Sequence, residues 1–559
     1  MEQIGSDTRE PPLLIQFRMF YNGYAVKGTL LVNKKLAPST IQIRESMIKV
    51  KPDPVSKHPT VNSLEIVRTR YLQHQLQSAE GNFLVKVFNC TTKPRGVPDK
   101  FFTDLLSKAL REDRGNFSNK HAAFKVAKKY GNMDSDFTVA RMIACGIPLD
   151  ESFLQYRLSV LTKDETKSLK KGKLLIPDCF FLMGTTDPTG KLKSDEVCVV
   201  LDNDQVLGKV LVYRYPGQHF GDIHVLKATN IEELESFVGN EKNAIFFSQK
   251  GARSVADEIA GGDLDGDLYW VSRNGELLKH FTPSEPWVPK PSMGKVDESK
   301  MPRNLSDEQL EDELIELFLK TRFQPSYAKS DAADSWLAHM DRSLTLGDDK
   351  VAERNAIKKK LIKLNDINHE ALDAPKKGVT IKVPRELRPK EFPHYMERKN
   401  SFKSNSILGK IYDQVKAYME EDLSKKEIRK LPCFDVDVPE NCWKSWKGNY
   451  DMYRAEMFNA LSNNDSNVKN KAADKIITKY KKLLYGAKEL EETTRKMDDI
   501  YNEALAIYNL SYNYAISKND VAKCSFAWKV AGSALFKLYA KKKGERTFIF
   551  SPSVLNEMF

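Results

Sequence analysis

Residues 261–270, with the sequence GGDLDGDLYW, constrain what this chain can fold into more than any other segment. Asp263, Asp265 and Asp267 alternate along it, Gly266 separates the last two, and an apolar run follows directly. Alternate side chains of an extended segment point the same way, and glycine lets the backbone curl, so the three carboxylates can converge. Clustered carboxylates repel one another unless a cation neutralises them. The pattern therefore predicts a loop that precedes a strand and holds a divalent cation. We expect Mg²⁺, with Mn²⁺ as the alternative.

Three interpretations of this loop compete on the local residues alone. Asp and Gly are common in exposed turns, but a solvated turn needs neither two leading glycines nor a strand directly after it. A calcium loop of the EF-hand type has Gly at its sixth position and Glu at its twelfth. This chain has Leu268 and Asn274 at those positions, so it departs from that pattern. The third interpretation is a phosphoryl-transfer site, in which carboxylate-bound Mg²⁺ contacts the attacking and leaving oxygens. The local residues favour this third interpretation without excluding the other two.

The sequence around the loop resembles a known family. Residues 246–253, FFSQKGAR, lead through Asp257 and Glu258 into the acidic loop, and this arrangement is similar to the catalytic loop of the cellular RNA-dependent RNA polymerases of RNA silencing. Matches to the same family occur in the family's order along most of the chain. The sequences at residues 25–28 and 526–529 are most similar to those of a plant subgroup. The further matching segments are GTTDPTG (184–190), GKVLVYRYP (208–216), GDIHVL (221–226), ALDAPKKG (371–378), EFPHYM (391–396) and SFAW (525–528).

The resemblance implies an α+β fold with two double-psi β-barrels and helical neck and head regions. Relatives carry a long segment ahead of the first barrel, so we expect this chain to be N-terminally truncated and its first barrel to be incomplete. Periodicity also predicts helices over 307–323 and 348–364 and one long helical stretch over 467–516. The expected regions are a partial first barrel (1–100), a helical connector (101–173), the second barrel with the acidic loop (174–280), a flexible connector (281–305), a mixed helical region (306–440) and a helical C-terminal region (441–559).

The same resemblance implies roles for basic residues near the N-terminus. Asp263, Asp265 and Asp267 would be the catalytic metal ligands, and Lys27 and Lys49 would reach toward the incoming nucleotide or the RNA 3′ end. A triphosphate needs more counter-charge than the metal supplies, and a lysine ammonium can supply it. Solvated lysines on a strand surface are the simpler alternative.

Three further basic residues are candidates for nucleotide or RNA binding. Arg44 would make a fixed contact with a phosphate or with a structural carboxylate. Lys250 and Arg253 lie on the segment that enters the acidic loop, where contacts with template or product phosphates are plausible. Ordinary charged residues at a strand end remain an equally open interpretation of these two.

Composition agrees with an intracellular nucleic-acid enzyme but does not identify one. The chain has 559 residues, 41% of them hydrophobic, which is enough for more than one domain. An excess of 88 basic over 76 acidic residues gives a net charge of +12, which favours a polyanionic partner. Seven cysteines without metal-ligand spacing indicate a reduced compartment. No signal peptide or membrane-spanning apolar run is found, so we expect a soluble nuclear or cytoplasmic protein with no membrane partner.

The function implied by the resemblance is Mg²⁺-dependent nucleotidyl transfer that copies single-stranded RNA into double-stranded RNA for small-RNA gene silencing. The expected partners are a single-stranded RNA template, nucleoside triphosphates and proteins of the silencing pathway. Because of the expected truncation, the main alternative is an RNA-binding pseudo-polymerase that keeps the loop without a working cleft. A DNA-templated or template-independent nucleotidyltransferase is a third possibility, because the fold does not dictate the template.

Overall fold

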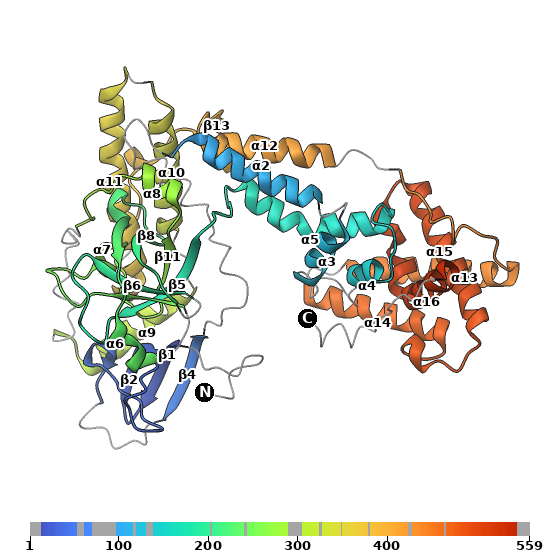
Figure 1. Ribbon diagram of the computed structural model, residues 1–559, viewed down its shortest axis with the longest axis horizontal. Helices are drawn as coiled ribbons and strands as arrows, with labels where there is room; N and C mark the ends of the chain where they lie inside the picture. Colours follow the sequence, from blue (N-terminus) through green and yellow to red (C-terminus); the bar gives the residue numbers. More distant parts are fainter. Residues whose placement is uncertain are drawn as a thin grey trace. The chain divides into compact units, whose positions relative to one another are not determined.

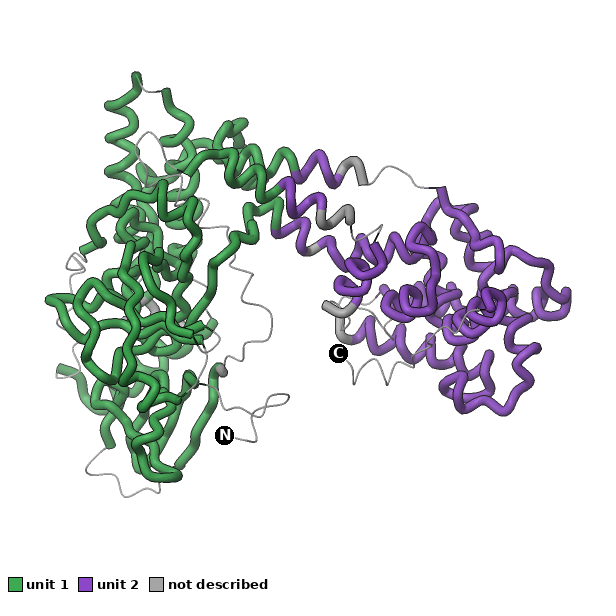
Figure 2. The backbone as a smooth tube through the Cα atoms, in the orientation of Figure 1, with its two compact units in different colours: residues 1–106, 169–414 green, residues 107–168, 415–559 purple. Residues whose placement is uncertain are grey.

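The computed structural model forms two compact units, which are coloured separately in Figure 2. Unit 1 contains Met1–Leu106 and Leu169–Gln414, and unit 2 contains Ser107–Ser168 and Val415–Phe559. Most of the predicted flexible connector, residues 289–303, lies outside the described residues. The structure describes residues 13–52, 61–69, 97–115, 119–129, 138–201, 204–239, 243–288, 304–323, 327–347, 349–377, 381–422, 427–462 and 466–544.

Unit 1 begins with a small antiparallel sheet in the order β3-β2-β1-β4. Its strands are β1 (Leu14–Tyr21), β2 (Tyr24–Leu31), β3 (Ile48–Val50) and β4 (Ser63–Thr69). Asn22 and Gly23 both have positive φ angles, of 47° and 80°, which suits the tight turn between β1 and β2. One face buries Ile15, Phe17 and Val26. In the described residues this sheet is open, so a first closed barrel is not confirmed.

A second sheet of unit 1 closes into a six-stranded barrel. The order is β10-β5-β11-β8-β9-β6, and β6 pairs back with β10. Two pairings, β10 with β5 and β6 with β9, are parallel, and the others around the barrel are antiparallel. The barrel strands are β5 (Cys179–Thr186), β6 (Glu196–Leu201), β8 (Gly208–Arg214), β9 (Ile223–Ala228), β10 (Ala244–Phe247) and β11 (Leu268–Ser272), and β7 (Asp204–Gln205) extends β6.

The barrel is stabilised by alternate apolar side chains that point inward. Val199, Val210, Val212 and Ile245 are almost completely buried in one cluster. Strand alternation places such residues on one face, and closure of the sheet removes the free strand edges. The mixed helix and sheet composition predicted from the sequence is confirmed, with one closed barrel.

Apart from a short parallel pair of strands, β12 (Phe392–Pro393) and β13 (Ser401–Phe402), the other regular elements of unit 1 are helices (Figure 1). The long helices α10 (Ala328–Thr345) and α11 (Val351–Lys377) form an antiparallel pair around Trp336 and Leu361. The helix predicted over 348–364 begins three residues later, at Val351, and extends to Lys377. The helix predicted over 307–323 is α9 (Asp307–Phe323). The other helices with residues in unit 1 are α2 (Asp99–Gly115), α5 (Ser152–Lys170), α6 (Glu232–Val238), α7 (Val255–Glu258), α8 (Gly275–His280) and α12 (Ile407–Asp422).

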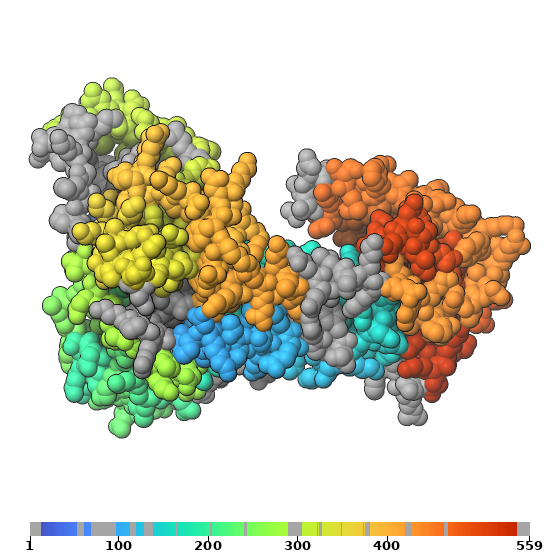
Figure 3. Space-filling view, turned by 90° about the horizontal axis from the view of Figure 1, so that it is seen from above, coloured from blue at the N-terminus to red at the C-terminus, as the bar shows by residue number. Residues whose placement is uncertain are grey.

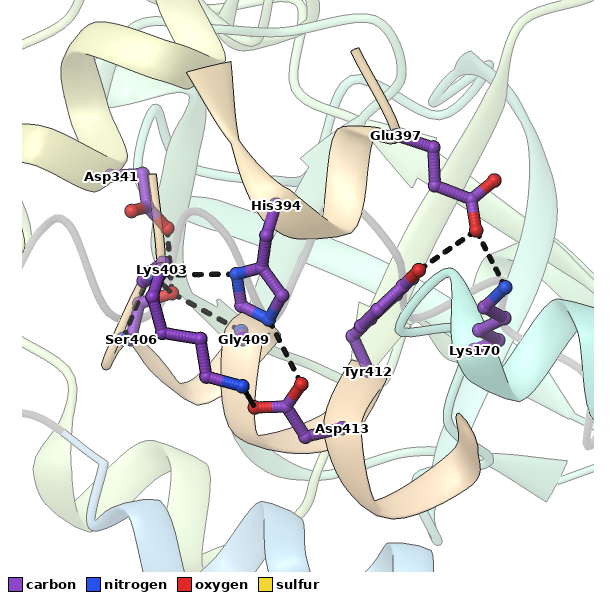
Figure 4. Close-up of polar contacts among 10 residues, drawn as sticks. Lys170, Asp341, His394, Glu397, Lys403, Ser406, Gly409, Tyr412 and Asp413 are labelled. Atoms are coloured by element: carbon purple, nitrogen blue, oxygen red, sulfur yellow. Dashed lines mark hydrogen bonds and ion pairs between the residues drawn. The ribbon is translucent and has the colours of Figure 1, made fainter. Parts of the chain in front are cut away.

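A polar network in unit 1 fixes the start of α12, and Figure 4 shows its side chains. The Nδ1 atom of His394 accepts a hydrogen bond from the backbone N–H of Ser404 at 3.0 Å. The proton therefore sits on Nε2, which lies 3.0 Å from Oδ1 of Asp413. Lys403 binds the other carboxylate oxygen of Asp413 at 2.6 Å. Nearby, the ammonium of Lys170 and the hydroxyl of Tyr412 both donate to the carboxylate of Glu397. Polar and charged contacts thus hold the loop before α12.

Unit 2 is helical in its described part. Its core packs aromatic rings, with the Phe526 ring centroid 4.2 Å from that of Tyr453 and 5.0 Å from that of Tyr450. The single stretch predicted over 467–516 is two helices, because Gly486, with a φ of 70°, ends the first of them. The helices that lie wholly within unit 2 are α3 (Lys120–Lys129), α4 (Thr138–Ala144), α13 (Glu440–Leu461), α14 (Ser466–Tyr485), α15 (Met497–Lys518) and α16 (Ser525–Lys543). In the described segments, no helix has the length and apolarity needed to cross a bilayer.

Candidate metal centre

The three aspartates of the acidic loop converge in space between α7 and β11. One ligand oxygen from each of Asp263, Asp265 and Asp267 lies within 4.8 Å of the others. The convergence agrees with the alternation seen in the sequence. Three carboxylate oxygens around one point are the ligands that a hard divalent cation such as Mg²⁺ prefers, so the residues fit such an ion.

The loop keeps this shape through an unusual backbone. Leu264 has a φ of 59° and Gly266 a φ of 116°, both in the region that side chains disfavour. The Oδ2 atom of Asp267 accepts hydrogen bonds from the backbone N–H groups of Asp263 at 2.9 Å and of Leu264 at 3.3 Å. Glycine is also required at Gly262, because a Cβ there would overlap the hydroxyl of Tyr269. The last aspartate of the motif therefore closes the loop as well as contributing to the acidic cluster.

Arg214 at the end of β8 orients Asp267. Its guanidinium donates to Oδ1 of Asp267 at 2.6 Å and to the carbonyl of Ala260 at 2.8 Å. Both side chains of this ion pair are mostly buried, with exposed fractions of 18% and 10%. Arg214 was not among the predicted site residues, although it lies in a segment matching the family. Arg214 reaches Asp267 because it pairs across the sheet with Tyr269, two residues after Asp267. The sequence does not reveal this strand pairing.

The first sheet contacts the loop from another direction. Nζ of Lys27 lies 2.5 Å from Oδ2 of Asp265. The side-chain amide of Gln16 donates to the carbonyl of Asp265 at 2.7 Å, and the hydroxyl of Thr29 donates to the carbonyl of Leu264 at 3.0 Å. Gln16 and Thr29 are paired residues of β1 and β2, so one face of the sheet supplies all three contacts. The acidic loop is therefore docked on the first sheet.

The charges of the site determine how its carboxylates titrate. Burial, together with the charges of Asp265 and Asp267, raises the pKa of Asp263 to about 6. Burial also acts to raise the pKa of Asp265, but the hydrogen bonds from Lys27 and Asp263 outweigh it and the pKa is lowered. The hydrogen bond to Asp265 raises the pKa of Lys27 in turn. Lys27 thus supplies part of the positive charge that this acidic cluster needs.

Two predicted basic residues of the first sheet lie apart from these contacts. Arg44 lines a mostly apolar cavity of about 490 Å³ beside Phe17 and Met47, and burial lowers its pKa. Nζ of Lys49 donates to the carbonyl of Ser46 at 2.9 Å in an exposed position. Among the contacts found for the described residues, neither side chain touches the three aspartates. Their binding of nucleotide or RNA stays a prediction.

The two basic residues before the loop differ in their surroundings. Lys250 is exposed, and its backbone N–H donates to the hydroxyl of Ser248 at 3.0 Å. The guanidinium of Arg253 lies 2.5 Å from Oδ2 of Asp257 and 2.6 Å from the carbonyl of Trp287. Arg253 therefore holds α7 against the segment after α8, and contact of either residue with RNA remains untested.

Two family models and several known proteins match the sequence of this chain. A family model described as RNA dependent RNA polymerase matches residues 1–415, and a second, for the head domain of these polymerases, matches residues 434–555. Probable RNA-dependent RNA polymerase 5 of Arabidopsis thaliana is 49% identical over 555 residues, covering 99% of this chain and 56% of the relative. Probable RNA-dependent RNA polymerase 4 of Oryza sativa subsp. japonica is 46% identical over 575 residues, covering 98% of this chain and 48% of the relative.

A solved structure shows the same fold at low sequence identity. RNA dependent RNA polymerase QDE-1 from Thielavia terrestris superposes with a TM-score of 0.68 at 15% identity, covering 99% of this chain and 66% of that chain. The fold of this chain is thus that of the polymerase structure. The chain belongs to the RNA-dependent RNA polymerase family of the RNA-silencing type, as its motifs predicted. It spans about half the length of the curated relatives that it matches.

Proposed function

We propose that this chain carries the nucleotidyl-transfer centre of an RNA-dependent RNA polymerase that copies single-stranded RNA into double-stranded RNA. The observation that carries the proposal is the convergence of Asp263, Asp265 and Asp267 within 4.8 Å, with Lys27 bound to one of them. We further propose that the closed barrel is the second double-psi barrel of the family, and that the first sheet belongs to the first. The double-stranded product would feed small-RNA silencing.

The three aspartates would hold Mg²⁺, or Mn²⁺ in its place. Such an ion, when bound, would stabilise negative charge on the phosphoryl oxygens and would activate the attacking 3′ oxygen as a nucleophile. Arg214 orients one carboxylate oxygen of Asp267, and the backbone N–H groups of Asp263 and Leu264 donate to the other. The chain thereby presents acceptor oxygens in a fixed geometry, which avoids reorganisation during the reaction.

Lys27 would exchange partners during the reaction cycle. Its ammonium neutralises Asp265 in the resting protein and lies on the sheet face that meets the loop. A nucleoside triphosphate brings several negative charges to this point, and a flexible ammonium can move a few ångströms to meet them. Lys27 would therefore bind the triphosphate, while Arg44, Lys49, Lys250 and Arg253 are proposed to add weaker contacts with nucleotide or RNA.

A nucleotide incorporation assay tests the proposal. The full chain is incubated with single-stranded RNA, labelled nucleoside triphosphates and Mg²⁺, without primer, and nuclease-resistant double-stranded product is measured. We expect Asp265→Asn to reduce incorporation by several orders of magnitude and Asp204→Asn, at an exposed aspartate of β7, to leave it unchanged. RNA binding is measured in parallel for both variants. If the parent chain binds RNA but incorporates no nucleotide, the pseudo-polymerase alternative replaces this proposal.

A further inference from the structure

Phe20 is a large apolar side chain that is exposed on the face of the first sheet that meets the acidic loop. Its exposed fraction is 56%. The register of β1 and β2 pairs Arg18 with Lys27 and Phe20 with Ala25. Paired residues, and every second residue along a strand, have their side chains on the same face. Since Lys27 contacts the acidic loop, Arg18 and Phe20 lie on that same face, one step and two steps further toward the β1–β2 turn.

Arg18 lies next to Lys27 and is held only by an exposed ion pair. Its Nη1 atom lies 3.4 Å from Oε2 of Glu65, and the two side chains are 59% and 62% exposed. An ion pair this exposed contributes little to stability, so the guanidinium can exchange its partner for a phosphate, which it binds through two N–H groups. The hydrogen bond to Asp265 raises the pKa of Lys27, and the charge of Arg18 acts against it. The two cations are therefore close enough to influence each other.

Apolar packing does not account for an aromatic ring at position 20. The two side chains before it on this face of β1 are Gln16 and Arg18. Across the residues that the structure describes, the ring of Phe20 contacts neither another ring nor a cation. Phe20 is two residues from Arg18, which is about 7 Å along the strand. Proteins that bind single-stranded nucleic acid combine basic groups along the backbone with aromatic rings on which bases stack, and this face has both.

We propose that Phe20 and Arg18 form a contact for single-stranded RNA beside the acidic centre. The ring of Phe20 stacks on one base, and the guanidinium of Arg18 binds a neighbouring phosphate. This inference rests on the proposed function, because it takes the strand to be the RNA on which the acidic centre acts. Stacking tolerates any base, so the contact holds the strand without selecting its sequence.

Fluorescence anisotropy on the full chain tests the contact, with Mg²⁺ present and without nucleoside triphosphates. The probe is a labelled single-stranded oligoadenylate, and a second probe is the same oligomer without its bases. We expect Phe20→Ala to weaken binding of the first probe about tenfold, because one stacked base is lost, and Phe20→Trp to retain it. On the probe without bases, Phe20→Ala should bind as the parent does. Only a stacking role predicts this difference between the two probes.

Arg18→Ala should give a different signature from Phe20→Ala. It should weaken the binding of both probes, and it should reduce the slope of log affinity against log salt by about one, because one phosphate contact is lost. Phe20→Ala should leave that slope unchanged, since the ring carries no charge.

Two matched variants control for exposure and for charge. Tyr21 is 53% exposed and follows Phe20 directly, but its side chain lies on the opposite face of the strand. Lys359 is an exposed lysine of α11, at the other end of unit 1 from the first sheet (Figure 1), and the yellow residues of α10 and α11 lie on the surface in the space-filling view (Figure 3). Tyr21→Ala and Lys359→Ala should both leave the RNA affinity unchanged. Circular dichroism checks that each variant remains folded.

Several results would overturn the proposal. They are a parent chain that does not bind the oligoadenylate, a Phe20→Ala variant that binds it with parental affinity, and a Tyr21→Ala variant that is weakened as much as Phe20→Ala. If Phe20→Ala raises only the KM for nucleoside triphosphates, the ring contacts the incoming nucleotide and the RNA contact is wrong. A chain that binds RNA through Phe20 but incorporates no nucleotide would contradict the proposed function and support this contact.

Discussion

The ammonium nitrogen of Lys27 lies 2.5 Å from Oδ2 of Asp265, and this ion pair joins the first sheet to the acidic loop of the barrel. The two residues are 238 positions apart in the chain. Gln16 and Thr29 add two hydrogen bonds from the same face to the loop backbone. The geometry of the acidic centre therefore depends on both sheets, although its three aspartates come from one short segment.

Lys27 should act on nucleotide binding rather than on metal binding. For Lys27→Ala we expect the KM for nucleoside triphosphates to rise about tenfold or more, because a phosphate contact worth at least 1.4 kcal/mol is lost. Mg²⁺ affinity should stay equal or increase, since no ammonium then competes for Asp265. Steady-state incorporation kinetics and calorimetric Mg²⁺ titration measure the two effects. Lys49→Ala is the matched comparison, and an equal rise in KM there would extend the same role to Lys49. Weaker Mg²⁺ binding by Lys27→Ala would contradict this role.

Arg214 should act as a positioning residue for Asp267. Arg214→Lys keeps the charge but loses the two-pronged contact with Asp267 and Ala260, so we expect incorporation to fall at least tenfold and to need more Mg²⁺. Arg214→Gln leaves a mostly buried carboxylate without its partner and should also lower stability, by about 3 kcal/mol. The readouts are the Mg²⁺ dependence of the rate and urea unfolding. A rate that falls with no change in Mg²⁺ dependence would argue against positioning.

Position 266 should not tolerate a side chain, because Gly266 lies close to the first sheet. A Cβ at Gly266 would overlap the side-chain amide of Gln16, and the φ of 116° is itself unfavourable for alanine. We expect Gly266→Ala to cost about 1–3 kcal/mol and to reduce incorporation strongly. Gly275→Ala is the control, because a Cβ there meets no atom within 4 Å. Adding Gln16→Ala to Gly266→Ala should recover part of the loss. If both glycine variants behaved alike, the docking of the loop on the first sheet would be wrong.

Asp222 should make stability depend on pH in a defined direction. Burial raises the pKa of this carboxyl group from 3.8 to about 7 in the folded protein. Between these values the folded state holds a proton that the unfolded state has released, so this group lowers the free energy of unfolding as pH rises from about 4 to about 7. Above pH 7 its effect is constant. Asp222→Asn removes this contribution, and its urea midpoint should fall less between pH 5 and pH 8 than that of the parent. Equal slopes for the two proteins would exclude a raised pKa at Asp222.

Several expectations from the sequence agree with the structure because they depend on local patterns. The helix over 307–323 and the strand directly after the acidic loop follow from hydrophobic periodicity over a few turns or residues. The convergence of the aspartates follows from alternation and from Gly266, which act over five residues. The split of the stretch over 467–516 was missed because helical periodicity continues on both sides of residues 486–496, a short break that begins with the left-handed Gly486 and contains a 3-10 turn. The resemblance led us to expect an incomplete first barrel; the described strands there form an open sheet, so a first barrel is not confirmed.

The sequence by itself determined the family, the alternation of strands and helices and the grouping of the three aspartates, because each is written in neighbouring residues. Only the tertiary structure decided which distant side chains reach those aspartates. Gln16, Lys27 and Thr29 meet the loop because β1 and β2 pair in one register, and Arg214 meets it because β8 pairs with β11. Strand register is set by barrel closure and by burial of one face, and a shift of one residue would turn every one of these side chains away. No local pattern encodes contacts between residues more than 50 positions apart, so the basic half of the centre became visible only in the folded chain.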